Sequence, residues 1–109
     1  MDQRLPPRVA ENEALARKVN EAIERGQWPG EDSAESAFRC ECAVVDCNRL
    51  IELTPREYEG VRADPRQFVV ARGHQRPEFE TVVQTEPGYL VVQKRGEAGV
   101  RAQETDPRG

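Results

Sequence analysis

Hydrophobic residues recur at helical spacing near the start of the chain, with charged residues between them. The apolar positions of this stretch share one face of a helix: Leu15, Val19, Ala22 and Ile23. Asn12 suits the N-cap, and Gly26 suits the position that follows the last turn. The pattern therefore predicts a helix over 12–25 after an irregular arm over 1–11. Its apolar stripe is narrow, and we expect it to dock on the rest of the domain or on another chain.

Short apolar runs in the middle of the chain predict strands. Two of them, over 38–42 and 49–53, flank a loop that carries three cysteines. A third run, over 67–71, is apolar after its first residue. The last two runs, over 79–85 and 89–94, are separated by a Glu-Pro-Gly sequence that is typical of a hairpin.

A strong local signal predicts a second helix directly after the second strand. Thr54 can cap this helix, Pro55 suits its first position, and Glu57 completes a capping box. The helix is expected to stop at the Asp-Pro pair that follows it. A weaker helical pattern over 96–103 is interrupted by Gly99, and the last residues of the chain are expected to fray.

The order helix, two strands, helix and three strands predicts an α+β fold. We expect a small, mainly antiparallel sheet with an N-terminal helix and a short second helix. The chain divides into an N-terminal arm, helix and linker over 1–36, an α+β core over 37–96 and a flexible tail over 97–109. The linker part, over 27–36, contains Trp28, which we expect to pack against the core.

Composition indicates a core that is thin for the length of the chain. Hydrophobic residues make up 37 % of the 109 residues and charged residues make up 33 %. An ordinary globular domain is roughly 45–50 % apolar. A compact unit of about sixty residues commonly needs a metal or another cross-link to supplement its core. The predicted core over 37–96 is of this size, so we expect it to be metal-stabilised.

Charge and targeting signals limit the kinds of partner. The net charge of −4 and the sequence pI of about 5.1 argue against a nucleic-acid-binding protein, because such proteins carry a basic footprint. No apolar run approaches the roughly 18 residues of a membrane helix, and the N-terminal residues lack the apolar segment of a signal peptide. We therefore expect a cytoplasmic protein whose partner is another protein, not nucleic acid or a membrane.

Three cysteines within eight residues form the main chemical motif of the chain: Cys40, Cys42 and Cys47, in the pattern C-x-C-x4-C. An odd number of thiols in one short segment is unlike the even, dispersed set of a secreted disulfide scaffold. A bridge between Cys40 and Cys42 would also close a very small, strained ring. In a reducing compartment, clustered cysteines more often bind metal or react than form disulfides.

A fourth ligand would complete a zinc site, because structural Zn2+ takes four ligands and Cys3His is a recognised set. His74 is the sole histidine of the chain, and it follows Gly73, whose backbone freedom helps to aim an imidazole. Glu41 and Asp46 are alternative oxygen donors. The candidate ligands of a structural Zn2+ are therefore Cys40, Cys42, Cys47 and His74.

The stretch from Phe38 through the cysteines to Gly73-His74 resembles a group of small bacterial proteins, chiefly actinobacterial, whose function is uncharacterised. The resemblance continues through 89–94 to the Glu-Thr-Asp-Pro-Arg sequence near the end of the chain. In that group C-x-C-x4-C is followed by Gly-His, so the resemblance implies the same four ligands. Ala43 stands where glycine is frequent in the group, and Arg72 stands where proline is frequent. Neither departure removes a ligand, and the resemblance implies no activity.

Other interpretations of the motif stay open at this point. The cysteines could be unligated, partly buried thiols, or one of them could be a reactive thiol. A CDGSH-type iron–sulfur site places its histidine close after the last cysteine, whereas His74 follows Cys47 by 27 residues. No catalytic set or phosphate-binding loop is recognisable. The sequence therefore predicts a non-enzymatic zinc-binding protein, a regulatory or protein-interaction module, with a thiol-based redox sensor as the alternative.

Overall fold

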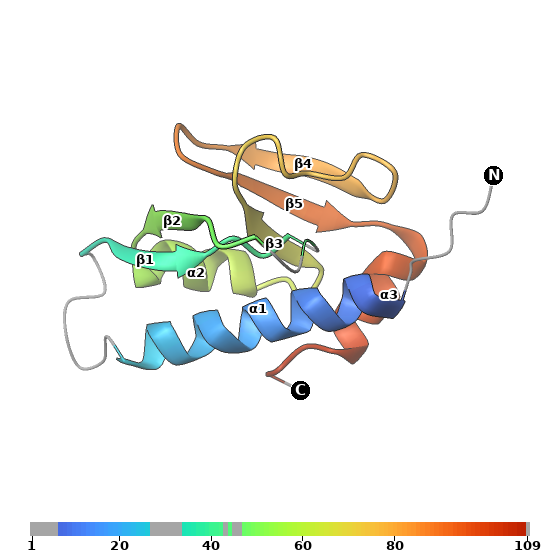
Figure 1. Ribbon diagram of the computed structural model, residues 1–109, viewed down its shortest axis with the longest axis horizontal. Helices are drawn as coiled ribbons and strands as arrows, with labels where there is room; N and C mark the ends of the chain where they lie inside the picture. Colours follow the sequence, from blue (N-terminus) through green and yellow to red (C-terminus); the bar gives the residue numbers. More distant parts are fainter. Residues whose placement is uncertain (1–6, 27–33, 43, 45–46, 109) are drawn as a thin grey trace.

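The structure is a computed structural model that describes residues 7–26, 34–42, 44 and 47–108. Within these residues the elements are α1 (Pro7–Gly26), β1 (Ser36–Arg39), β2 (Leu50–Leu53), α2 (Pro55–Arg62), β3 (Gln67–Val70), β4 (Glu80–Thr85), β5 (Leu90–Lys94) and α3 (Gly96–Glu104) (Figure 1). The predicted α+β fold is confirmed. Most of the predicted linker, including Trp28, lies outside the described residues.

The strands form two small antiparallel sheets where the sequence predicted one. In the first sheet β1 pairs with β2, and Phe38 lies opposite Ile51. In the second sheet β5 lies between β3 and β4, with an irregular register between Val82 and Gln84. The two sheets meet where the Glu41 N–H donates a hydrogen bond of 2.8 Å to the carbonyl of Val69. The chain that follows β1 therefore continues as a partner of β3.

The second helix forms as its capping box predicts. The Glu57 N–H donates to the Thr54 hydroxyl at 3.0 Å, and the Thr54 N–H donates to the Glu57 carboxylate at 2.8 Å. The helix places Tyr58 against Phe38, with ring centroids 4.7 Å apart in a stacked arrangement. Both rings are fully buried. Local capping thus fixes the helix at the position where it closes the core beneath the first sheet.

Helix α1 starts earlier than the sequence predicted and buries a different face. It begins at Pro7, so Asn12 lies inside the helix and is not its N-cap. Proline at the first helical position is common, because its missing N–H has no partner there. Of the predicted apolar stripe, Leu15 is 56 % exposed and Ala22 is exposed, whereas Val19 and Ile23 are half-buried and Ile23 packs against the core. The buried positions have the same helical spacing but are mostly polar: Glu13, Ala16, Arg17, Asn20 and Glu21.

The buried face of α1 is held by charge pairs to distant parts of the chain. Lys94, at the end of β5, forms ion pairs with both Glu13 and Glu80.

Arg17 lies over the ring of Phe68, with its guanidinium carbon 4.2 Å from the ring centroid. The Arg17 guanidinium also donates to the carbonyls of Ala102 and Pro65. Glu21 pairs with Arg62 at 2.8 Å. The helix therefore docks on its own domain through polar contacts.

Helix α3 and the residues after it are tied to the rest of the molecule. A Cβ added at Gly99 would lie 3.0 Å from the carbonyl of Lys94 and 2.8 Å from the Arg66 side chain, so glycine permits this close approach. Asp106 pairs with Arg62, and Arg108 pairs with Glu21. The sequence predicted a frayed end; the ion pairs hold it against α1 and α2. The three-segment division of the chain stays a prediction.

Candidate metal centre

Four side chains from two separate parts of the chain converge at one end of the first sheet. The ligand atoms of Cys40, Cys42, Cys47 and His74 all lie within 4.8 Å of one another. The three cysteines are buried and form no disulfide, and His74 is half-buried. The structure thus brings together the four residues that the sequence selected as ligands.

Backbone hydrogen bonds position the cysteines. Cys40 follows β1 directly, and its N–H donates to the carbonyl of Arg49 at 3.0 Å, which extends the pairing of β1 with β2. The N–H of Cys47 donates to the carbonyl of Val44 at 3.0 Å, and this turn brings Cys47 back toward Cys40. The Arg39 guanidinium also donates a hydrogen bond of 3.4 Å to the carbonyl of Cys47, which ties Cys47 to the end of β1.

His74 reaches the cluster through a tight turn after β3. Its N–H donates to the carbonyl of Ala71 at 2.9 Å, and Gly73 inside the turn has φ +91°. This left-handed conformation favours glycine, because other residues would be strained there. The Nδ1 atom of His74 lies 3.6 Å from the Sγ atoms of both Cys40 and Cys47. The imidazole therefore faces the sulfur atoms with one nitrogen.

The two sulfur-to-nitrogen distances from His74 match the ligand spacing of a tetrahedral zinc site. Zinc binds sulfur at about 2.3 Å and histidine nitrogen at about 2.0–2.1 Å, so two such ligands at a tetrahedral angle lie about 3.6 Å apart. The two measured sulfur-to-nitrogen distances are 3.6 Å. The donor set, three soft thiolates and an imidazole, is also the set that zinc prefers for a closed site.

The surroundings of the cluster favour a thiolate even before a metal binds. The closeness of the two thiols lowers the pKa of Cys42 and, together with burial, raises the pKa of Cys40. Cys40 in turn accepts a hydrogen bond of 3.1 Å from the N–H of Ala71. Backbone donors of this kind hold a sulfur ligand in place and delocalise its charge.

Glu41, between two of the cysteines, is turned away from the cluster into the core. Its carboxylate is fully buried and accepts hydrogen bonds from the Tyr58 hydroxyl at 2.6 Å and the Val69 N–H at 3.0 Å. The Asn20 side chain donates to it at 2.9 Å. Burial raises the pKa of Glu41 against the effect of these donors. The other alternative donor, Asp46, lies outside the described residues.

Asn20 links this carboxylate to the edge of the first sheet. Its side-chain oxygen accepts from the Arg39 N–H at 2.7 Å, and its side-chain nitrogen donates to the Arg39 carbonyl at 2.8 Å. One amide side chain thus satisfies the outer edge of β1 as a neighbouring strand would. The sequence analysis missed this role, because the only signal is the spacing of Asn20 from Glu13 and Arg17 on one helical face.

Comparison with known proteins adds no family. No family model matches the chain, and neither the curated proteins nor the solved structures give a match. The resemblance to small actinobacterial proteins therefore stays a prediction. No helix among the described residues is both long and apolar enough to cross a membrane.

Proposed function

We propose that the chain is a zinc-binding protein in which Cys40, Cys42, Cys47 and His74 hold one structural Zn2+. The observation that carries this proposal is the pair of 3.6 Å distances from His74 Nδ1 to two sulfur atoms, the spacing of neighbouring ligands around zinc. Four protein ligands fill a tetrahedral site and leave no position for a catalytic water. The metal stabilises the fold and takes no part in a reaction.

The position of the cluster explains what such a metal stabilises. Cys40 belongs to the end of the first sheet, and His74 belongs to the turn after β3 of the second sheet. A metal that binds both closes a long loop of chain and cross-links the two sheets. Structural zinc supplies folding free energy directly, because the unfolded chain has no preformed site. In this role the metal supplements a core with few apolar residues, and the folded unit serves as a regulatory or interaction module for a partner protein.

Cobalt substitution tests whether the site is closed. We expect the Co2+ form to show intense visible bands of a tetrahedral centre and strong thiolate charge-transfer absorption. His74→Ala should change the visible bands while thiolate absorption persists, and Glu78→Ala, at an exposed position after the turn, should leave both unchanged. The weak bands of a five- or six-coordinate ion in the wild type would contradict the structural role, since they indicate an open position.

The alternative function, a thiol-based redox sensor, uses the same cysteines. Oxidation of a thiolate would remove a ligand, release the metal and loosen the link between the sheets. Redox-sensing cysteines are solvent-accessible, whereas Cys40 is 1 % and Cys42 5 % exposed. We therefore expect mild peroxide to leave the metal bound. Rapid zinc release with recovery on adding thiol would favour the sensor instead.

A further inference from the structure

Strand β2 has one edge that the described chain leaves without a partner. Its inner edge pairs with β1, and the hydrogen bond from Cys40 to Arg49 fixes which residues face inward. Because hydrogen-bonded pairs alternate along an antiparallel ladder, the N–H and C=O groups of Leu50 and Glu52 point away from β1. The described residues provide no hydrogen-bond partner for these groups. The edge is a template for another strand.

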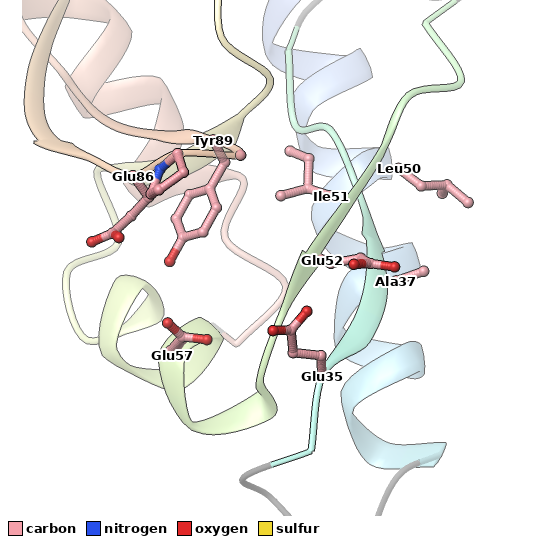
Figure 2. Close-up of a pocket in the computed structure, with 10 residues that line it drawn as sticks. Glu35, Ala37, Leu50, Ile51, Glu52, Glu57, Glu86 and Tyr89 are labelled. Carbon is pink, nitrogen blue, oxygen red and sulfur yellow. The ribbon is translucent and has the colours of Figure 1, made fainter.

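An open groove of about 620 Å3 runs along β2 (Figure 2). One wall is β2, whose Ile51 side chain points toward Tyr89 in the turn of the β4–β5 hairpin on the opposite wall. Leu50 and Glu52 also line the groove, with side chains that extend away from Tyr89. The volume lies within the roughly 300–1,000 Å3 of typical ligand sites. Leu50 is 65 % exposed beside it, so an apolar side chain of an incoming strand would find a contact.

The groove is acidic. Four glutamates line it: Glu35, Glu52, Glu57 and Glu86. Among the described residues, no lysine or arginine lines it. Burial, together with the charges of Glu57 and Glu86, raises the pKa of Tyr89 to about 12. Four like charges around one groove attract a cationic partner and repel an anionic one.

The other free edges differ from β2. The outer edge of β1 is satisfied at Arg39 by the Asn20 side chain, as described above. The outer edge of β4 is interrupted by the irregular register between Val82 and Gln84, a feature that discourages strand pairing. Strand β2 combines a regular register, an acidic groove and backbone groups to which the described part of the chain provides no partner.

We propose that β2 binds an extended, basic segment of a partner protein by strand addition, with arginine or lysine side chains of the segment facing the glutamates of the groove. Backbone hydrogen bonds to Leu50 and Glu52 would supply affinity, and the glutamates would select the charge of the partner. The groove is separate from the metal centre. The test uses the zinc-loaded protein, so that loss of the metal cannot account for a change in peptide binding.

The test is a binding titration with a fluorescent probe, a capped hexapeptide of alternating arginine and valine. We expect saturable binding that weakens at least about tenfold at high salt, and no binding of the matched glutamate–valine peptide. Glu52→Lys should weaken binding at least about tenfold, whereas Glu97→Lys, an equal charge change at an exposed position of α3, should not. Circular dichroism and zinc content should show both variants folded.

Backbone methylation separates strand addition from simple charge attraction. Two further probes carry N-methyl groups on the valines or on the arginines, so each removes one of the two alternating sets of N–H donors. Strand addition predicts that one probe loses at least about tenfold in affinity and that the other binds like its parent. Equal binding of both probes, or equal loss in Glu52→Lys and Glu97→Lys, overturns the proposal. Failure of the arginine probe to bind zinc-loaded wild type overturns it as well, and leaves the metal site unaffected.

Discussion

The cysteine corner, formed by Cys40, Cys42, Cys47 and His74, and the interface beneath α1 border the same small core and differ in chemistry. At the corner, the ligand atoms of four side chains converge within 4.8 Å, an arrangement that could hold a metal ion. Beneath α1, buried charges of both signs pair directly, as Lys94 does with Glu13 and Glu80. The proposed zinc would make the corner depend on a bound ion, whereas the helix interface uses only side chains of the protein itself.

The two regions are also connected. Asn20 of α1 contacts Glu41, and Glu41 lies between Cys40 and Cys42 in the chain. A metal cross-link raises the free energy of unfolding when the ion binds. A buried ion pair contributes little net stability, but removal of one partner is strongly destabilising. The proposed metal would therefore supply stability that the small apolar core lacks, whereas the ion pairs beneath α1 are mainly costly to break. The following predictions test each region in turn.

Removal of the metal is expected to have the largest effect. A chelator should lower the free energy of unfolding by at least roughly 5 kcal/mol, equivalent to a fall of about 20 °C or more in Tm, because structural zinc supplies folding free energy. Thermal unfolding with and without chelator measures this. The Cys40→Ser variant should start destabilised and show no further response to chelator. An unchanged Tm of the wild type in chelator would contradict the structural role of the corner.

Loss of Lys94 is expected to rank second. Lys94→Met leaves the carboxylates of Glu13 and Glu80 buried without their cation, which should cost about 3–5 kcal/mol in the free energy of unfolding. Urea denaturation measures the change. The triple variant that also carries Glu13→Gln and Glu80→Gln should recover most of the loss. A Lys94→Met protein as stable as wild type would show that the ion pairs beneath α1 do not form.

The link between the two regions should show a smaller effect. Asn20→Ala removes three hydrogen bonds to Arg39 and Glu41 and leaves buried groups unsatisfied, so we expect a loss of roughly 2–4 kcal/mol. Its zinc affinity should fall about tenfold, since Glu41 holds the segment between two ligands. Chelator competition measures the affinity, and Lys18→Ala on the exposed face of α1 is the control. A normal zinc affinity in Asn20→Ala would mean that the regions act independently.

The pH dependence of stability should reveal the buried charge beneath α1. Burial, more than any neighbour, raises the pKa of Glu13 from 4.5 to about 7, although Lys94 opposes this. Between pH 4.5 and about 7, the Glu13 carboxyl group is therefore protonated in the folded chain and ionised in the unfolded chain. This contribution, about 3 kcal/mol at most, is present below pH 4.5 and is lost as the pH rises through 7.

Comparison with Glu13→Gln isolates this effect. Zinc binding also changes with pH, but the difference in unfolding free energy between wild type and Glu13→Gln, measured at saturating zinc, removes that common part. The unfolding free energy of the wild type should fall relative to that of Glu13→Gln as the pH rises from 4.5 to 8. A difference that does not vary with pH would show that Glu13 titrates normally.

The smallest effect is expected at the apolar side of α1. Leu15 is 56 % exposed, so Leu15→Ala should change the free energy of unfolding by less than about 0.5 kcal/mol. Its neighbour Ala16 is 3 % exposed, and Ala16→Leu should cost about 1–3 kcal/mol through overpacking. If the apolar stripe were the buried face, Leu15→Ala would cost more stability than Ala16→Leu, since truncation of a buried leucine costs about 2–5 kcal/mol.

Local signals predicted the elements and the candidate ligands. The capping box at Thr54 fixed α2, because both of its hydrogen bonds lie within four residues. The cysteine spacing and the single histidine selected four residues that the structure does bring together. These features depend on nearby residues or on rare residue types, so one sequence suffices to find them.

The orientation of α1 could not be predicted in the same way. Periodicity of apolar residues placed Leu15 inside, but the buried face is polar and its partners, such as Lys94 and Arg62, lie far away in the chain. A buried Glu13 is indistinguishable in sequence from a solvated one until its partner is known. The ion pairs of Arg108 at the end of the chain were missed for the same reason.

Zinc content with and without the fourth ligand tests the central claim most directly. Elemental analysis of the purified wild type beside His74→Ala, after equal exposure to a competing chelator, measures whether Cys40, Cys42, Cys47 and His74 form one site. We predict one zinc ion per wild-type chain and a marked loss from His74→Ala, with Glu78→Ala, at an exposed position after the same turn, retaining the metal as a control. A wild type that is metal-free yet folded and stable would contradict the account.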